Sequence, residues 1–355
     1  MGVIIAIIIF GLIVTVHEFG HFICAKLSGI KVLEFSVGMG PKLFQKQKGE
    51  TKYSLRALPI GGYCAMEGED STNSDPRSFR NAKLWKRMIV LVAGALMNFV
   101  LGIIMIIILL SFLLDTVPTT VVSGFHGKRN EDNTVTYYAR SLETGLQQDD
   151  KFIYIDDMRI YSSWDLINVF DTFEENVGHT VVVKRDGKRV KLENVFFGET
   201  VDDDGIIDFG VYHRKKNPLT VLKGAGELYM TMSHVVTMSL KQLLTGKAKK
   251  EDVSGPVGVV SAISETAEQS KSVGDAAYSL IFLTALITIN VGIFNLLPIP
   301  GLDGGRLLFC LIELVRRKPV KPEHEGYVHL AGMVLLFGIM IFATYNDIVK
   351  LVTGG

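Results

Sequence analysis

Four long apolar segments constrain the fold of this chain more than any other feature. They cover residues 2–24, 88–114, 277–297 and 327–345, and each approaches the roughly 20 apolar residues that a bilayer-spanning helix needs. The chain has 355 residues, of which 48% are hydrophobic and 21% are charged. The charged residues gather between the apolar segments, so we expect a polytopic α-helical membrane protein with about four transmembrane helices and one inserted water-exposed domain.

Composition excludes several other classes of protein. The formal net charge is zero, which gives no general attraction to nucleic acid, so no nucleic-acid partner is expected. Three cysteines, Cys24, Cys64 and Cys310, lie far apart, which argues against a disulfide framework. The first apolar segment lacks a basic start and an Ala-x-Ala cleavage site. It is therefore expected to remain as a membrane helix and not to be removed as a signal peptide.

Basic residues predict how the helices are oriented. Residues 25–87 are rich in Lys and Arg, and the loop 306–326 holds five more. Because such residues accumulate on the cytosolic side, both regions are expected there, and residues 115–276 are expected outside. Residues 219–245 are moderately apolar but carry four ionisable side chains. We expect an amphipathic helix on the outer membrane surface in place of a fifth span.

A metal-binding pattern lies within the first apolar segment, at His17-Glu18-Phe19-Gly20-His21. Residues four apart share one face of a helix, so the two imidazoles can converge on one ion. Glu18 follows the first imidazole and can reach a water bound to that ion. An ordinary polar helix face is the alternative. In an apolar helix three ionisable groups are costly without a partner or a function, which favours a zinc site.

A third ligand is expected near the end of the third apolar segment, where Asn295-Leu-Leu-Pro298-Ile-Pro300-Gly301-Leu302-Asp303 occurs. The prolines stop the helix, and the glycine permits a tight turn. His17 lies about 22 Å along its helix at 1.5 Å per residue, so it falls near the cytosolic boundary, as Asp303 does. The alternative is a simple turn with a solvated Asp303.

At these two motifs the chain resembles the site-2 protease family of intramembrane zinc metalloproteases, and within it the bacterial regulator-of-sigma-E protease group. The resemblance implies that His17, His21 and Asp303 bind one catalytic Zn²⁺ and that Glu18 is the catalytic base. It also implies that Asn295 helps to hold an unwound substrate. The similarity extends over most of the chain.

Two further segments carry this resemblance. The stretch Leu58-Pro-Ile-Gly61-Gly62-Tyr63 resembles the family's membrane-associated β-loop, which implies that Gly61, Gly62 and Tyr63 contact substrate through an exposed strand edge. A plain hairpin bent at the two glycines is the alternative. Gly94-Ala-Leu-Met-Asn98 resembles another family pattern, and here we favour a helix–helix hydrogen bond for Asn98.

Residues 115–217 are expected to form the water-exposed domain. Two short β-branched runs, 180–184 and 189–192, flank Arg185-Asp-Gly-Lys188, which predicts a hairpin with a tight Asp-Gly turn. The region resembles a PDZ domain, an α+β fold that captures peptides by strand addition. The resemblance implies a filter for bulky ectodomains. A β-rich spacer without a ligand is the alternative.

The predicted order of parts follows from these observations. We expect transmembrane helix 1 at 1–24, the β-loop region at 25–87, transmembrane helix 2 at 88–114, the PDZ-like domain at 115–217, the amphipathic segment at 218–276, transmembrane helix 3 at 277–305, a cytosolic loop at 306–326 and transmembrane helix 4 at 327–345.

The expected function is an intramembrane zinc metalloendopeptidase of the bacterial cytoplasmic membrane. The resemblance implies single-span membrane proteins as substrates, either anti-sigma factors or remnant signal peptides. It also implies a zinc site near the cytosolic face and an extracytoplasmic PDZ-like domain. A catalytically silent membrane chaperone on the same scaffold is the main alternative, although such a protein is expected to lose Glu18. A metal transporter is less consistent with the sequence, which has no repeated halves.

Overall fold

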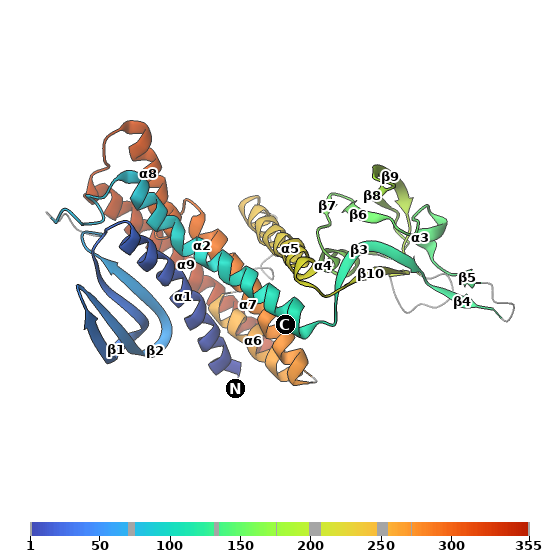
Figure 1. Cartoon of the computed structure of the whole chain (residues 1–355), viewed down its shortest axis with the longest axis horizontal. Helices are drawn as coiled ribbons and strands as arrows, with labels where there is room; N and C mark the ends of the chain where they lie inside the picture. The colour runs from blue at the N-terminus through green and yellow to red at the C-terminus, as the bar shows by residue number, and fades with distance from the viewer. Residues whose placement is uncertain are drawn as a thin grey trace. The chain divides into compact units, whose positions relative to one another are not determined.

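A computed structural model describes residues 2–69, 75–130, 135–174, 176–198, 207–246, 255–270 and 272–353. The chain forms two compact units, one made of residues 1–105 and 236–355, the other of residues 106–235. The first unit contains α1 (Gly2–Leu27), β1 (Val32–Lys48), β2 (Thr51–Met66), most of α2 (Leu84–Ile108), α6 (Pro256–Gln269), α7 (Val273–Leu296), α8 (Asp303–Arg316) and α9 (Pro322–Thr353) (Figure 1).

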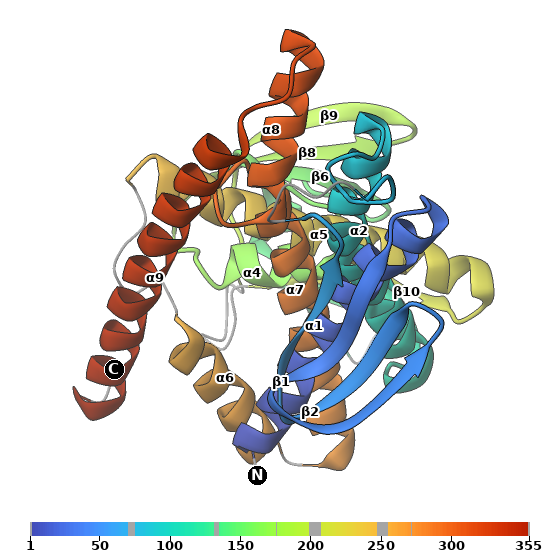
Figure 2. The ribbon, with the colours of Figure 1, turned by 90° about the vertical axis from the view of Figure 1, so that its left-hand side faces the viewer.

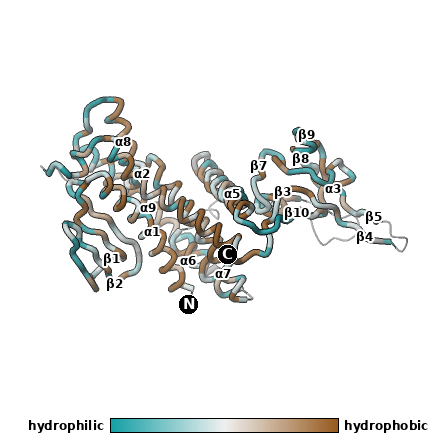
Figure 3. The backbone as a smooth tube through the Cα atoms, viewed as in Figure 1, coloured by the Kyte–Doolittle hydropathy of each residue, from teal (hydrophilic) through white to brown (hydrophobic). Residues whose placement is uncertain are grey.

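Four helices are long and apolar enough to cross a membrane, as the sequence predicts. They cover Gly2–Leu27, Leu84–Leu113, Val273–Leu296 and Glu323–Leu351. Figure 3 shows hydrophobic residues along most of their length, whereas the outer parts of β1 and β2 are largely hydrophilic. The expectation of a helical membrane protein with a sheet-rich insertion is therefore confirmed.

The spanning helices lie close to the predicted segments and extend a few residues beyond them at several ends. The second span continues beyond Ile108 as a π-helical turn, η1 (Leu109–Leu113). The third helix stops at Leu296, as expected from Pro298 and Pro300, which cannot extend it. The part predicted at 277–305 therefore contains most of this helix and the turn after it. A separate helix, α8, then begins at Asp303 and occupies much of the basic loop that was expected at 306–326.

A close crossing of α1 and α2 organises the first unit. A Cβ atom added at Gly20 of α1 would lie 2.3 Å from the carbonyl oxygen of Ala93 in α2. Small residues allow two helix backbones to approach in this way, and close approach is the main source of helix–helix packing in a bilayer. Further along α1, the buried side chains of Ala6, Ile9 and Ile13 pack with α2, α6 and α7.

The two long strands of this unit form a bent antiparallel sheet. Val37 of β1 pairs with Gly62 on one side and with Leu55 on the other. The register therefore places residues 32–37 between 62–66 and 51–55, and the latter also pair with 42–48. Residues 62–66 form an edge of this sheet. β2 packs against α1 (Figure 2), which brings that edge beside the helix of the His-Glu-x-x-His motif.

The second unit is rich in strands. It contains η1, β3 (Thr116–Phe125), β4 (Gly127–Arg129), β5 (Val135–Tyr137), α3 (Arg140–Glu143), β6 (Lys151–Ile155), β7 (Met158–Arg159), α4 (Ser163–Phe170), β8 (His179–Arg185), β9 (Lys188–Val195), β10 (Phe209–Lys215) and most of α5 (Pro218–Leu244). The main sheet has the order β10-β3-β6-β8-β9, with β7 paired to β6.

The expected hairpin between β8 and β9 is confirmed. Asp186 and Gly187 take φ angles of 48° and 79°, which a two-residue turn of type I′ requires. Inside the sheet, Phe152, Val181, Val183 and neighbouring apolar side chains form one buried core. The second unit therefore has a hydrophobic core of its own. The assignment of a PDZ-like fold to it remains a prediction.

Within 218–276, expected to form one amphipathic surface segment, the described residues form α5, α6 and the first turn of α7. α5 buries Val221 and Leu228 and exposes Leu219, Leu222 and Met230. The hydroxyl of Thr231 donates to Asp165 at 2.6 Å, which ties α5 to α4. The shorter helix, α6, packs against α1, α7 and α9 in the first unit.

A buried carboxylate of α9 caps the start of α6. Asp347 is 3% exposed, and its oxygens accept hydrogen bonds from the backbone N–H groups of Gly255, at 3.0 and 3.2 Å, and Gly258, at 2.7 Å. The first N–H groups of a helix have no partner within the helix, and the helix dipole favours negative charge there. Asp347 therefore fastens the last spanning helix to α6.

Removal of this cap is expected to destabilise the protein. Asp347→Ala leaves buried donors unpaired, which costs about 1–3 kcal/mol, and the melting temperature in detergent should fall by several degrees. Asp347→Asn keeps one acceptor oxygen and should lose less. Equal melting temperatures for the wild type and both variants would contradict this account.

Candidate metal centre

Three side chains from two distant helices meet in the first unit. His17 and His21, one turn apart on α1, have their Nε2 atoms 3.2 Å from each other. The Oδ2 atom of Asp303, the first residue of α8, lies 3.0 Å from Nε2 of His17 and 3.2 Å from Nε2 of His21. Both histidines are buried. The structure thus brings together the three ligands that the sequence predicts.

The irregular chain between α7 and α8 carries Asp303 to this position. Gly301 takes a φ of +98°, a left-handed conformation that favours glycine. A Cβ atom at Gly304 would lie 2.0 Å from the carbonyl oxygen of Leu297. On the other side, the ring of His329 in α9 accepts a hydrogen bond from the Gly301 N–H at 3.0 Å. Tight packing of this turn therefore fixes the start of α8.

The donor set and its spacing fit a zinc ion. Two imidazole nitrogens and one carboxylate oxygen are the ligands of many catalytic zinc sites, which keep a fourth position for water or substrate. Ligands about 2.0–2.1 Å from a tetrahedral zinc are themselves separated by about 3.3 Å. The three potential ligand atoms lie within 4.8 Å of one another, and the 3.0–3.2 Å separations are close to this value.

Hydrogen bonds orient the two imidazole rings. Nδ1 of His21 lies 2.8 Å from the carbonyl oxygen of Val90, so Nδ1 carries the proton and Nε2 keeps its lone pair for a ligand. Nδ1 of His17 lies 3.3 Å from the side-chain amide of Asn98. Exchanging the nearly equivalent O and N of this amide makes its oxygen the acceptor for Nδ1–H. Such outer partners fix the tautomer of a ligating histidine.

Asn98 has a role that the sequence did not predict in full. It does form the expected hydrogen bond between helices, but its partner is a candidate metal ligand. Its side chain is fully buried, and with the amide nitrogen facing His17 its oxygen has no hydrogen-bond partner among the described residues. The exchange of O and N satisfies that oxygen. The spacing Gly94-x-x-x-Asn98, which places both residues on one face of α2, is the signal that could have indicated this role.

Gly94 provides the space for both rings. A Cβ atom there would lie 2.4 Å from Nε2 of His21 and 2.7 Å from Nε2 of His17. These distances are shorter than real Cβ contacts. The imidazoles thus lie against the bare backbone of α2, and sequence analysis did not identify this contact.

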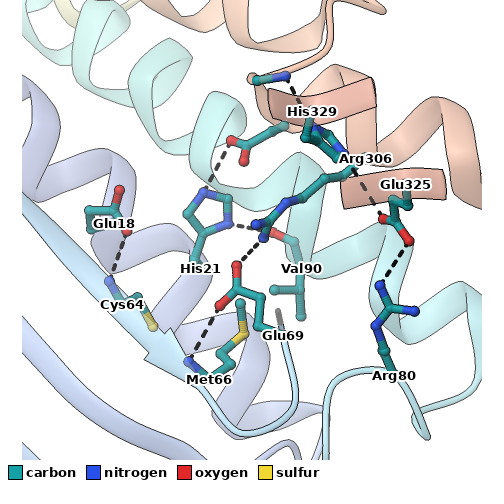
Figure 4. Close-up of polar contacts among 12 residues, drawn as sticks. Glu18, His21, Cys64, Met66, Glu69, Arg80, Val90, Arg306, Glu325 and His329 are labelled. Carbon is teal, nitrogen blue, oxygen red and sulfur yellow. Dashed lines mark hydrogen bonds and ion pairs between the residues drawn. The ribbon is translucent and has the colours of Figure 1, made fainter. Parts of the chain in front are cut away.

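Glu18 lies beside the same group. Its Oε2 atom accepts a hydrogen bond from the backbone N–H of Cys64 in β2 at 3.0 Å (Figure 4). A cavity of about 570 Å³ is lined by Glu18, His21 and Asp303, by residues 63–66 of β2, and by parts of α8 and α9. The candidate base, two candidate ligands and a strand edge therefore face one space.

Two neighbours in β2 remain uncharged at neutral pH. Burial, followed by the negative charge of Glu18, raises the pKa of the Cys64 thiol well above its usual range. Burial and the hydrogen bond to Glu34 raise the pKa of the Tyr63 hydroxyl. Neither side chain supplies an anionic ligand. The charged and basic groups that line the cavity are therefore carboxylates, imidazoles and the guanidinium groups of Arg80 and Arg306.

The residues expected to bind substrate lie in different surroundings. Tyr63 lines the cavity, and a Cβ atom at Gly62 would lie 2.7 Å from the carbonyl oxygen of Ser36 and 3.9 Å from Cγ of Glu18. Gly61 takes a φ of +79° at the bend before them. The amide of Asn295 donates to the carbonyl of Val291 on its own helix at 3.0 Å. The structure therefore brings the β2 residues to the site more directly than Asn295.

The sequence of this chain is similar to a protein family and to several named proteins. The family model described as Peptidase family M50 matches residues 5–339. A protein from Clostridium perfringens named as a zinc metalloprotease is 34% identical over 98% of this chain and 99% of its own length. A similarly named protein from Fusobacterium nucleatum is 33% identical over 99% of both chains. The zinc metalloprotease RasP of Geobacillus kaustophilus is 29% identical over 97% of both.

A methyl group on Gly94 is expected to displace both imidazole rings. Gly94→Ala should lower the zinc content of the purified protein well below one ion per chain, as measured by elemental mass spectrometry. Gly338→Ala is the matched control, because Gly338 also lies in a spanning helix and a Cβ atom there meets nothing within 4 Å. Full zinc content in Gly94→Ala would contradict the described packing.

Proposed function

This chain belongs to peptidase family M50, and from that premise we propose that it is an intramembrane endopeptidase that cleaves single-span membrane proteins. That it is a zinc metalloprotease with membrane-spanning helices follows from its family and its four apolar helices. The observation that supports the finer proposal is the convergence of His17 and His21, in the apolar helix α1, with Asp303 at the start of α8. Glu18 faces the adjoining cavity.

We assign the three converging side chains as the zinc ligands and Glu18 as the general base. Bound zinc lowers the pKa of a coordinated water toward about 7 and polarises the scissile carbonyl. Glu18 takes a proton from the attacking water and later delivers it to the leaving amine. Val90 and Asn98 hold the rings of His21 and His17, so that their Nε2 lone pairs point to one place.

The strand edge supports a route for substrate binding. A helical substrate segment has its carbonyl groups tied up in helix hydrogen bonds, so it must unwind before its peptide bond can be attacked. An extended segment can then pair with residues 62–66 by strand addition. In this proposal Gly61 and Gly62 let the substrate approach, Tyr63 flanks it, and Asn295 holds the unwound chain near the end of α7.

The distribution of basic residues supports one orientation of the chain in the membrane. The basic residues of 25–87 and 306–326 favour the cytosolic face of a bacterial cytoplasmic membrane. The candidate ligands His21 and Asp303 immediately precede these two regions in sequence. We propose that the second unit is an extracytoplasmic PDZ-like domain that excludes bulky ectodomains. Anti-sigma factors already shortened outside, or remnant signal peptides, fit such a filter.

A silent chaperone on the same scaffold is not supported. A protein without catalysis does not need the carboxylate of Glu18, which is retained beside the candidate ligands. Family membership and the zinc metalloprotease relatives also favour an enzyme. Hydrolysis is therefore the function that we propose for this site.

Substitution of the base tests the proposed mechanism. Glu18→Gln should retain zinc but lose cleavage of single-span peptides in proteoliposomes by at least about 100-fold, the usual contribution of a general base. Glu50→Gln is a control, because Glu50 pairs with Lys26 and Arg77 and does not line the cavity. Cleavage at the wild-type rate by Glu18→Gln would exclude Glu18 as the base.

A further inference from the structure

The free edge of β2 carries two backbone N–H groups that point away from β1. Cys64 and Met66 are two residues apart in the strand, so their N–H groups face the same side. The N–H of Cys64 donates to Oε2 of Glu18 at 3.0 Å. The N–H of Met66 donates to Oε2 of Glu69 at 3.4 Å. Both of these donors are thus occupied by carboxylates of the chain itself (Figure 4).

Glu69 reaches the edge because the chain folds back after β2. Gly68 takes a φ of +65°, which permits the tight turn that follows Met66. The other oxygen of Glu69, Oε1, forms an ion pair with Arg306 in the first turn of α8. Arg306 lies three residues after Asp303, and both Arg306 and Glu69 line the cavity. The turn after β2 is thereby fastened to the helix that carries a candidate zinc ligand.

A carboxylate oxygen on a strand-edge N–H occupies the position that a peptide carbonyl takes when another strand is added. The hydrogen bond from Met66 is long for an N–H···O contact, and the side chains of Glu69 and Arg306 remain 19% and 29% exposed. Water can therefore solvate both groups once they separate. These features describe a weak internal competitor for the substrate-binding edge.

We propose that Glu69, held by Arg306, occupies the place of a substrate carbonyl on the edge of β2 and must be displaced when an extended peptide pairs there. This inference rests on the proposed proteolytic function and identifies a residue that controls access to its substrate-binding edge. The ligand class is an unwound peptide segment, recognised by its backbone carbonyls. Glu69 does not take part in the chemical step, so it affects affinity and not hydrolysis.

Two zinc-binding probes distinguish binding at the edge of β2 from binding at the metal. A tripeptide hydroxamate presents backbone carbonyls as well as a metal-binding group, whereas acetohydroxamate presents only the metal-binding group. Their dissociation constants would be measured by calorimetry on the zinc-loaded full chain in detergent. For Glu69→Ala, the Kd of the tripeptide hydroxamate should fall about two- to tenfold, the equivalent of one lost competing hydrogen bond. The Kd of acetohydroxamate should stay unchanged.

Two more variants keep the test decisive. Glu69→Gln preserves the shape of the side chain but places an NH₂ donor at one of the two oxygen positions, so that it faces either Arg306 or the Met66 N–H as a donor. A smaller fall in Kd is expected, and this variant replaces Glu69→Ala if the alanine protein melts early. Glu50→Ala removes a glutamate with two basic partners away from the cavity, and should leave both Kd values unchanged.

Hydrogen exchange gives a reading that is independent of any ligand. In Glu69→Ala the amide of Met66 should exchange faster than in the wild type, whereas the amide of Cys64, still bonded to Glu18, should not. An unchanged or higher Kd for the tripeptide hydroxamate in both Glu69 variants would overturn the inference, even if the wild type cleaves peptides. Failure of the proposed function would appear differently, as absence of cleavage and of acetohydroxamate binding in the wild type.

Discussion

The convergence of two imidazoles from the apolar helix α1 with one carboxylate at the start of α8 is the interaction on which the rest of the structure depends. Unpaired ionisable groups are costly within an apolar spanning helix, so each one needs a partner. His17 and His21 meet Asp303 on one side and the hydrogen-bonding groups of Asn98 and Val90 on the other. The bare backbone at Gly94 lets α2 approach closely enough for these contacts to form. The metal centre and the packing of α1 on α2 are therefore parts of one arrangement.

The sheet of the first unit is joined to this centre through the candidate base. The hydrogen bond between Glu18 and the Cys64 N–H links α1 to the edge of β2, and the ion pair between Glu69 and Arg306 links the end of β2 to α8. The candidate base, the candidate metal ligands His21 and Asp303, and the strand edge thus lie around one cavity. An extended peptide on that edge would lie within reach of the base, and it would compete with both glutamates for the two N–H groups.

The sequence predicts the number of spans, the helical His-Glu-x-x-His pattern and the β8–β9 hairpin, because each depends on local spacing. Asp303 required more than spacing: the two prolines and the resemblance to a known family directed attention to it. Three features lay beyond the sequence. The contact of Gly94 with both rings and the pairing of Asn98 with His17 depend on how α2 is rotated about its axis. The return of Glu69 to the β2 edge depends on a turn of only two residues. The end of the third helix at Leu296 agrees with the expectation that Pro298 and Pro300 stop it.

The central claim is that one zinc ion is held by these three side chains. X-ray absorption at the zinc edge of the purified full chain, combined with anomalous diffraction, measures the ligand atoms and their positions directly. We expect one zinc ion with two imidazole nitrogens and a carboxylate oxygen at about 2.0–2.2 Å, located between His17, His21 and Asp303. A zinc ion bound elsewhere, or a centre that lacks the carboxylate of Asp303, would contradict the account.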